Sequence, residues 1–336
     1  MAAHVGLDYK VGWICATSTE LAMATEMLDE GYDLPSRTPG DSNIYTLGRI
    51  GVHHVVIACL PAGRHGNGAA AIVASQMWSS FKSLKFALLV GIGGGVPSAE
   101  RDIRLGDVAV SQPDNQFGGV VQYDLGKTEA DGKFVRTGSL NAPPTVLLAA
   151  LQKLKSNHYR GISKSSEYLN KLFMKDDFVL RRPGREMDRL FQAKYQHIGG
   201  PNCDECSTQH LVARNPREEV VVYYGTIASG NQEIQDGLIR QRLSDDLGGV
   251  LCFEMEAAGL MNTFPCLVIR GVCDYSDSHS NDHWHEYAAA TAAACAKELL
   301  SIIPMQEVIN TQAVEQAITS ERREYIFVAS TYYAVR

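Results

Sequence analysis

The chain has 336 residues, of which 45% are hydrophobic and 21% are charged, and its formal net charge is −7. This much apolar material builds a full core in one large or two modest domains, which excludes a disordered chain and a small disulfide-stapled fold. An acidic chain without a basic stretch is also a poor candidate for binding nucleic acid or a membrane through bulk charge. No apolar run approaches the roughly 20 residues of a membrane span, and most of the eight cysteines lie in apolar segments. We therefore expect reduced thiols and a cytoplasmic protein.

Short apolar runs rich in β-branched residues alternate with helix-like segments along the chain. Most of these runs are apolar throughout, which is typical of strands buried on both faces. We expect strands at Val11–Ala16, Val55–Leu60, Phe86–Gly91, Asp107–Ser111, Val220–Ala228, Val250–Glu254 and Cys266–Cys273. We expect helices at Thr19–Leu28, Ala69–Phe81, Thr145–Lys155, Glu233–Leu243, Met255–Asn262 and Tyr287–Ile302. This order predicts one α/β domain over residues 1–305, with functional groups at the carboxyl ends of its strands.

Two parts of the chain depart from this alternation. Residues 157–217 are polar and charged, and we interpret them as an insertion on the core that carries some helix. Residues 306–336 form a C-terminal tail whose placement the sequence does not indicate, although Ile326–Val335 is β-prone.

The first candidate for chemistry is Glu20, at the point where the first strand meets a Ser/Thr-rich turn and a helix. A capping box, with Thr17 as the cap and Glu20 three residues later, explains the same pattern. The next candidate is the glycine-rich segment Gly91–Gly95, for which we expect a loop that lets backbone approach a ligand. It matches neither the Walker motif nor a dinucleotide fingerprint, and a tight turn is the alternative.

Two acids, Glu254 and Glu256, flank Met255 at the end of an apolar strand. Buried carboxylates are costly unless they are hydrogen-bonded, and a sugar diol is a natural partner. The alternative is an acid pair at a helix start, stabilised by the helix dipole. Asp274 follows the last predicted strand and is well placed for acid–base catalysis, with an Asx turn as the alternative.

Taken together, these segments resemble the nucleoside phosphorylase superfamily, which includes purine and uridine phosphorylases and methylthioadenosine/S-adenosylhomocysteine nucleosidases. The likeness is closest to fungal members found as N-terminal domains of NLR-like proteins. The matched segments are Val11–Leu21, Val55–Gly68, Leu88–Pro97, Leu105–Gln112, Gly118–Lys127, Thr137–Pro144, Tyr224–Gly237, Gly249–Met261 and Pro265–Ser278. The resemblance implies a central mixed sheet flanked by helices, a purine nucleoside as the small-molecule partner, and a homodimer or higher homo-oligomer.

The resemblance also implies site residues. Glu20 would direct the attacking water, Met255 and Glu256 would hold the ribose, and Asp274 would protonate the purine as it leaves. Trp284 matches an aromatic residue over the ribose, and Asn231 stands where the family has an aspartate. The implied substrate contacts are Met255, Gly93, Gly94, Ser229, Asn231, Glu254, Trp284, Arg64, His65 and Cys273. Near the base, Glu233 stands where the family often has an aromatic residue, so the contacts to the base differ from the family pattern.

Water is favoured over phosphate as the nucleophile. The phosphorylases of this family carry an arginine in the first strand-turn and another before the glycine-rich segment, and this chain has neither. A carboxylate at Glu20 would also repel phosphate. We therefore expect hydrolysis to free base and ribose, with adenosine, inosine and guanosine as the leading substrates; methylthioadenosine is less favoured, since the 5′ region is rich in histidine. One residue favours the alternative: Arg64 would hold phosphate if the protein were a phosphorylase.

Three further hypotheses remain open. A nucleotide nucleosidase of an immune-type effector would need cations near the ribose 5′ end, and the candidates are Arg64, His65, His279, His283, His285, Arg181, Arg182 and Arg185. A nucleoside-sensing module without turnover would not require the acids. A zinc site is suggested by Cys203 and Cys206, spaced as CxxC with His197 and His210 nearby. The catalytic scheme needs no metal or other cofactor, and we expect none.

Overall fold

The structure is a computed structural model that describes residues 8–33, 39–114, 116–175, 181–200, 202–280 and 282–312. Its strands are β1 (Val11–Cys15), β2 (Glu30–Tyr32), β3 (Tyr45–Ile50), β4 (His53–Cys59), β5 (Phe86–Gly95), β6 (Val108–Ser111), β7 (Val120–Gln122), β8 (Gly126–Thr128), β9 (Phe134–Arg136), β10 (Val222–Gly225), β11 (Ile227–Ser229), β12 (Cys252–Glu254) and β13 (Cys266–Asp274). Its helices are α1 (Ser18–Glu26), α2 (Asn67–Ser80), α3 (Thr145–Tyr159), α4 (Ser165–Phe173), α5 (Gly237–Asp246), α6 (His285–Ile302) and α7 (Met305–Asn310).

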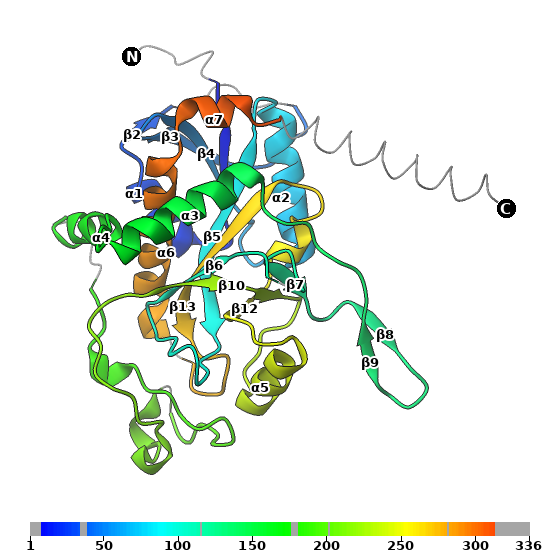
Figure 1. Ribbon diagram of the computed structural model, residues 1–336, viewed down its shortest axis with the longest axis vertical. Helices are drawn as coiled ribbons and strands as arrows, with labels where there is room; N and C mark the ends of the chain where they lie inside the picture. Colours follow the sequence, from blue (N-terminus) through cyan, green and yellow to red (C-terminus); the bar gives the residue numbers. More distant parts are fainter. Residues whose placement is uncertain are drawn as a thin grey trace.

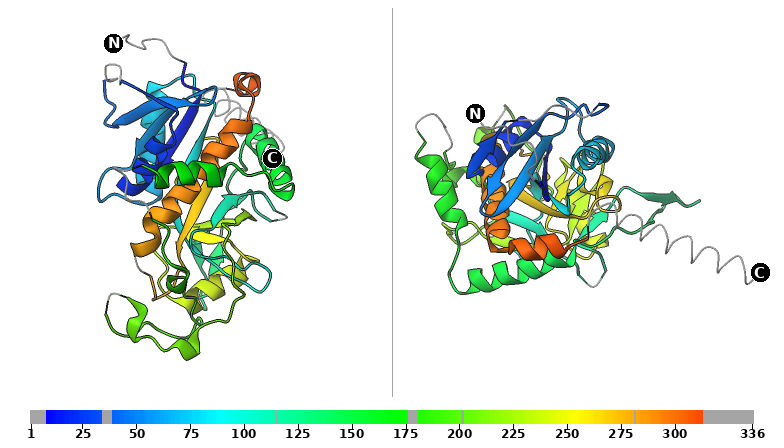
Figure 2. Two further views of the ribbon diagram at one scale, coloured as in Figure 1. Left: turned by 90° about the vertical axis from the view of Figure 1, so that its left-hand side faces the viewer. Right: turned by 90° about the horizontal axis from the view of Figure 1, so that it is seen from above.

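Eleven strands form one mixed sheet in the order β10-β6-β13-β5-β1-β4-β3-β2, and β7, β11 and β12 form a branch from it (Figure 1). The central strands β4, β1, β5 and β13 are parallel, so their carboxyl ends meet at one edge. Helices α1, α3, α4 and α6 pack on one face and α2 packs on the other (Figure 2). The α/β class with a central mixed sheet is confirmed.

Helix α6 shows how composition permits this packing. Its alanine-rich sequence is buried along most of its length, because small side chains let the helix approach the sheet closely. At Gly271 in β13, an added Cβ would lie only 3.0 Å from Ala288 Cα and nearer still to other backbone atoms of α6. A side chain at that position would push the helix off the sheet.

Each of the seven expected strands overlaps an observed one, and three expectations need correction. The glycine-rich segment is not a loop: β5 continues to Gly95, because β13 and β12 pair with it along its whole length. The expected strand Val220–Ala228 divides into β10 and β11. The expected helix Met255–Asn262 is only a 3₁₀ turn, η4 (Ala257–Gly259), followed by further turns before β13 begins at Cys266.

Residues 157–217 form two structural parts. The first contains α4, whose Leu169 and Leu172 pack into the main core. The second, residues 181–217, is a lobe with short 3₁₀ turns beyond the carboxyl ends of β5 and β13 (Figure 1). We call it the insertion lobe.

The expected tail, residues 306–336, is described only as far as residue 312. Most of this stretch is α7, in which Val308 is buried in the core. The β-prone run Ile326–Val335 lies outside the described residues. Within the described part of the chain, no helix combines the length and apolarity needed to cross a bilayer.

Candidate active site

Glu20 lies in the first turn of α1 with only 4% of its surface exposed. Its carboxylate accepts hydrogen bonds from the backbone amides of Ala16 at 2.6 Å and Thr17 at 3.1 Å. The other carboxylate oxygen accepts from the amide of Ile92 in β5 at 2.9 Å. Thr17 accepts from the amide of Glu20, so the capping box is present. The same carboxylate therefore caps the start of α1 and also contacts the carboxyl-terminal half of β5.

Three carboxylates surround one arginine at the heart of the site. The guanidinium of Arg270, on β13, donates to Glu254 and, at 3.2 Å, to Glu256. Arg270 is 1% exposed and the two glutamates are each 5% exposed, so water screens these charges poorly. Burial raises the pKa of Glu254. Although burial opposes it, the charges of Glu254, Glu256 and Glu20 hold the pKa of Arg270 above its usual value.

The two glutamates after β12 have different surroundings. Glu254 accepts from the backbone amides of Glu256 and Ala257, so it caps the η4 turn in the manner expected of an acid at a helix start. Glu256 accepts from the amide of Gly66 at 3.3 Å on one oxygen and from Arg270 on the other. Each carboxylate oxygen can accept two hydrogen bonds, so Glu256 can still accept from a sugar hydroxyl.

The glycines of β5 let these groups pack against the strand. An added Cβ would lie 2.5 Å from Arg270 Nη1 at Gly91, 2.8 Å from the carbonyl oxygen of Phe253 at Gly93, and 2.6 Å from Asp274 Oδ1 at Gly94. One extended strand thus contacts both the arginine and the candidate acid. The glycines allow protein side chains and backbone to approach closely, and they do so from a strand rather than from the expected ligand-binding loop.

Asp274 lies at the end of β13 and is partly exposed. Its Oδ1 accepts from the amide of Ser276 at 2.6 Å, which makes the Asx turn, and Ser276 has a φ of 50°. Its Oδ2 accepts from the thiol of Cys273 at 3.1 Å. Burial raises the pKa of Asp274 and, further still, that of the Cys273 thiol. A carboxyl group with a raised pKa is suited to donate a proton.

A cavity of about 270 Å³ separates Asp274 from the insertion lobe. It is lined by Leu105, Met187, Arg189, Asn202, Cys203, Asp204, Cys273, Asp274, Tyr275, His279 and His283. Residues from three separate parts of the chain therefore enclose the candidate acid. A ligand in this cavity would contact Asp274.

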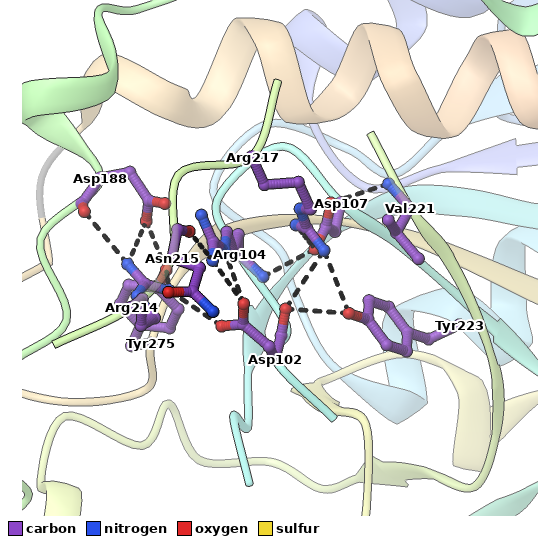
Figure 3. Close-up of polar contacts among 10 residues, drawn as sticks. All are labelled: Asp102, Arg104, Asp107, Asp188, Arg214, Asn215, Arg217, Val221, Tyr223 and Tyr275. Atoms are coloured by element: carbon purple, nitrogen blue, oxygen red, sulfur yellow. Dashed lines mark hydrogen bonds and ion pairs between the residues drawn. The ribbon is translucent and has the colours of Figure 1, made fainter. Parts of the chain in front are cut away.

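A second cavity, of about 550 Å³, lies beside the first and is lined by Arg104, Arg182, Arg185, Arg189, Arg214 and Arg217. Carboxylates hold several of these arginines in a network (Figure 3). Arg217 pairs with Asp107, and Arg214 pairs with Asp188 at 3.0 Å. Burial raises the pKa of Asp107 to about 6, although Arg217 opposes this shift. The network fastens the end of the insertion lobe to the start of β6.

Other predicted contacts lie around these groups. Ser229 is buried and accepts from the amide of Ala258 at 2.9 Å. Asn231 is exposed, and its amide donates to Asp124 at 2.7 Å. Trp284, expected over the ribose, is 2% exposed, packs edge-on to Tyr287 and lines the larger cavity.

The loop before α2 carries Arg64 and His65, which are both exposed. From this loop, Gly66 donates to Glu256, so the loop itself contacts the acid cluster. Met255 is half-buried between the two glutamates.

The structure thus brings Glu20, Glu254 and Glu256 together near Arg270, and β13 places Asp274 opposite Gly94 of the glycine-rich strand β5. The sequence reasoning assigned no role to Arg270. The signal was present, because a single arginine interrupts the otherwise apolar stretch Cys266–Cys273.

Two groups of side chains have metal-ligating atoms close together in the described residues. The first is Cys273, Asp274 and His285, and the second is His197, Cys206 and His279; within each group the ligand atoms lie within 4.8 Å of one another. His210, which the sequence suggested as a zinc ligand, belongs to neither group. Its ring stacks on Tyr195 with centroids 4.2 Å apart.

Comparison with known sequences identifies relatives over most of the chain. The family model described as the phosphorylase superfamily matches residues 10–304. The chain is 50% identical over 303 residues to a nucleotide-binding leucine-rich repeat (NLR)-like protein of Hyaloscypha variabilis, covering 89% of this chain but only 30% of that relative's length. It is 24% identical over 300 residues to a 5′-methylthioadenosine/S-adenosylhomocysteine nucleosidase of Mycobacterium bovis, covering 88% of this chain and 97% of the relative. It is also 25% identical over 240 residues to the ATP nucleosidase Cap17 of Escherichia coli, covering 70% of this chain and 39% of the relative.

Solved structures share the fold at lower identity. An S-adenosylhomocysteine nucleosidase from Streptococcus pyogenes superposes with a TM-score of 0.58 at 17% identity, covering 90% of this chain and 100% of that one. A futalosine hydrolase of Helicobacter pylori superposes with a TM-score of 0.56 at 16% identity, covering 87% of this chain and 97% of that one.

Proposed function

The chain belongs to the phosphorylase superfamily, and on that premise we propose that it hydrolyses the N-glycosidic bond of a purine ribonucleoside to free base and ribose. The leading substrates are adenosine, inosine and guanosine. The main support is a buried cluster in which Arg270 pairs with Glu254 and Glu256, while the charge of the buried Glu20 also acts on that guanidinium.

The cluster has more carboxylates than guanidinium groups, and this excess of negative charge suits the cleavage of an N-glycosidic bond. Cleavage of an N-glycosidic bond develops positive charge on the sugar and negative charge on the departing base. Carboxylates in a water-poor site stabilise the sugar cation without reorganising, which makes their contribution larger than in bulk water. Glu256 would accept hydrogen bonds from the ribose hydroxyls and hold the sugar beside the other two carboxylates.

The proton and electron movements can be assigned to named groups. As the bond from C1′ to the purine breaks, its electron pair passes to the base, and Asp274 donates a proton to N7. Water adds to C1′, and Glu20 receives the proton that this water loses. Asp274 fits the acid role because its pKa is raised and it lines the cavity beneath the insertion lobe.

The same cluster disfavours phosphate as the nucleophile. A phosphate dianion needs cations with free donors, and Arg270 already donates to Glu254, Glu256 and the carbonyl oxygen of Ile92. Arg64, the candidate phosphate ligand of a phosphorylase, is exposed. These contacts support hydrolysis over phosphorolysis.

The role of Glu256 has a direct test. Base release by the wild-type protein should be much faster from inosine than from 2′-deoxyinosine, and Glu256→Gln should reduce this preference. Equal rates on the two substrates would contradict a carboxylate that holds the ribose hydroxyls. The resemblance to the family also supports a homodimer or higher oligomer, which light scattering on the purified protein would test.

A second candidate function is removal of the base from a nucleotide such as ATP. The observation that favours it is the arginine-lined cavity, into which the insertion lobe brings Arg182, Arg185 and Arg189. Several of these arginines are engaged by carboxylates, which is why we place this candidate second. Turnover of ATP at a higher kcat/KM than adenosine, lost in Arg182→Ala, would make it the first. A nucleoside-sensing module would bind these substrates without turnover.

A further inference from the structure

We propose that His197, Cys203, Cys206 and His279 bind one zinc ion that fastens the insertion lobe to the loop after β13. Cys206 Sγ lies 3.5 Å from His197 Nδ1, and Cys203 Sγ lies 3.7 Å from the same nitrogen. Tetrahedral zinc, with bonds of about 2.3 Å to sulfur and about 2.0–2.1 Å to nitrogen, places its sulfur and nitrogen ligands roughly 3.5 Å apart. The distances therefore fit a shared ion.

The fourth side chain comes from a distant part of the chain. Ligand atoms of His197, Cys206 and His279 all lie within 4.8 Å of one another. The side chain of His279 is only 3% exposed, and neither of its ring nitrogens has a hydrogen-bond partner among the described residues. A buried, unpartnered ring beside the Cys206 thiol and the His197 imidazole is unfavourable unless something binds it. A zinc ion would satisfy it.

Both histidines have the outer contacts that metal-binding imidazoles usually have. His197 Nε2 lies 2.8 Å from the carbonyl oxygen of Gly200. Donating its proton there leaves Nδ1, which faces the two sulfurs, free to bind a metal. His279 Nδ1 lies 3.4 Å from Asp277 Oδ1, within ion-pair distance, and the proposal therefore takes Nε2 as the metal-binding atom. Such contacts to a carbonyl or a carboxylate fix the tautomer and orientation of a ligating ring.

The ligand set matches a structural zinc centre in type and in position. Two cysteines spaced as CxxC and two histidines form a common structural set. The cysteines lie at the 3₁₀ turn η2 (Cys203–Glu205), where the backbone brings both side chains to one side. The amide of His197 also donates to Ser278 Oγ at 2.9 Å, so the two segments already touch beside the metal position.

The proposed zinc ion would affect the candidate active site because it lies beside the cavity that Asp274 lines. Cys203 and His279 line the same cavity as Asp274. An ion that joins them would hold the insertion lobe against the loop that carries the candidate acid. The inference does not depend on the proposed activity, because it rests on the ligand geometry alone. It departs from our sequence-based expectation of no metal, because sequence position pointed to His210 and not to His279.

The test is to measure zinc in the full-length protein, purified under reducing conditions and reloaded with zinc. We expect about one zinc per chain in the wild type and in the control His210→Ala. Cys206→Ser and His279→Ala should each lose most of it. Full retention of zinc in both variants, or no zinc in the reloaded wild type, would overturn the proposal.

A second measurement uses only the wild-type protein and so avoids variants that fail to fold. Cobalt(II) in place of zinc should give the sulfur-to-cobalt charge-transfer band and the visible bands of a tetrahedral site with thiolate ligands. An octahedral spectrum without thiolate bands would contradict the proposal, as would a Cys203–Cys206 disulfide in the reduced protein. His285→Ala should keep its zinc, which separates this centre from the group of Cys273, Asp274 and His285.

Discussion

Charged side chains are bound differently in two neighbouring regions, the carboxyl ends of the sheet strands and the insertion lobe beyond them. At the strand ends, Glu20 and Glu254 are bound mainly by backbone amides, and one buried arginine faces an excess of carboxylates. In the lobe, arginines outnumber the acids around the larger cavity and are bound by side chains of distant segments (Figure 3). The difference shows that backbone amides at the strand ends position the acids, whereas ion pairs between side chains hold the lobe in place.

The largest expected effect is on the candidate acid. Asp274→Asn removes the proton donor but keeps the side chain's size, so turnover should fall by about 10²–10⁴-fold with substrate binding retained. Steady-state kinetics and a binding assay on the same protein would check this. The exposed Asp246→Asn on α5 is the control and should keep its activity. Undiminished turnover in Asp274→Asn would remove this residue as the acid.

The next effect is on the stability of the strand ends. Arg270→Met leaves Glu254 and Glu256 buried without their cation, and removing one member of a buried ion pair typically costs about 3–5 kcal/mol. Urea unfolding of this variant should show that loss. Arg64→Ala, at an exposed position, should stay within about 0.5 kcal/mol of wild type. A small effect of Arg270→Met would mean that the glutamates are not held as charges.

The docking of the insertion's first helix should depend on pH. Glu298, on α6, accepts from the amides of Lys164 and Ser165 at the start of α4. Although burial opposes it, the bonds from His158, Ser165 and Lys164 lower the pKa of Glu298 from 4.5 to about 2. A lowered folded-state pKa stabilises the fold above about pH 4.5, and this stability is lost as the pH falls toward 2.

Glu298→Gln should therefore cost about 2–3 kcal/mol at pH 7, and the difference from wild type should shrink as the pH falls below 4.5. Unfolding curves across this range would measure it. The exposed Glu307→Gln on α7 should behave like wild type throughout. A difference that does not change with pH would contradict the assigned hydrogen bonds.

The smallest expected effect is in the arginine network of the lobe. Tyr275 donates to Asp188 and accepts from Arg214 at 2.8 Å. Tyr275→Phe removes the hydroxyl from both partners and should cost about 1–2 kcal/mol. Tyr159→Phe, at a residue that is 88% exposed, is the matched control. A loss as large as that of Arg270→Met would show that the two regions are not built differently.

The strand ends were largely predictable from the sequence. Apolar runs that end in acids or glycines indicate buried parallel strands, and the ends of such strands meet at one edge, so Glu20, Glu254, Glu256 and Asp274 were identified as candidates. The extension of β5 through Gly95 was not predictable, because a run of glycines favours a turn when only the neighbouring sequence is considered. The segment is held extended by its pairing with β13 on one side and with β12 at its end, which the local sequence does not show.

The insertion lobe was much less predictable. Its contacts join residues far apart in the sequence, such as Arg217 with Asp107 and His197 with His279. Neither pair shows a periodicity or a motif, since side-chain contacts between irregular segments leave no spacing to detect. The CxxC pair was visible in the sequence, but its partner His279 was visible only in the structure.

The most direct test of the proposed hydrolysis is the sugar product of nucleoside cleavage. Base release from adenosine, inosine and guanosine would be measured with and without inorganic phosphate, and the sugar identified. We expect free ribose at a rate that does not depend on phosphate, because the carboxylates of the acid cluster already engage Arg270 and Arg64 is exposed. Ribose 1-phosphate, formed only when phosphate is present, would contradict the proposed hydrolysis and make the protein a phosphorylase.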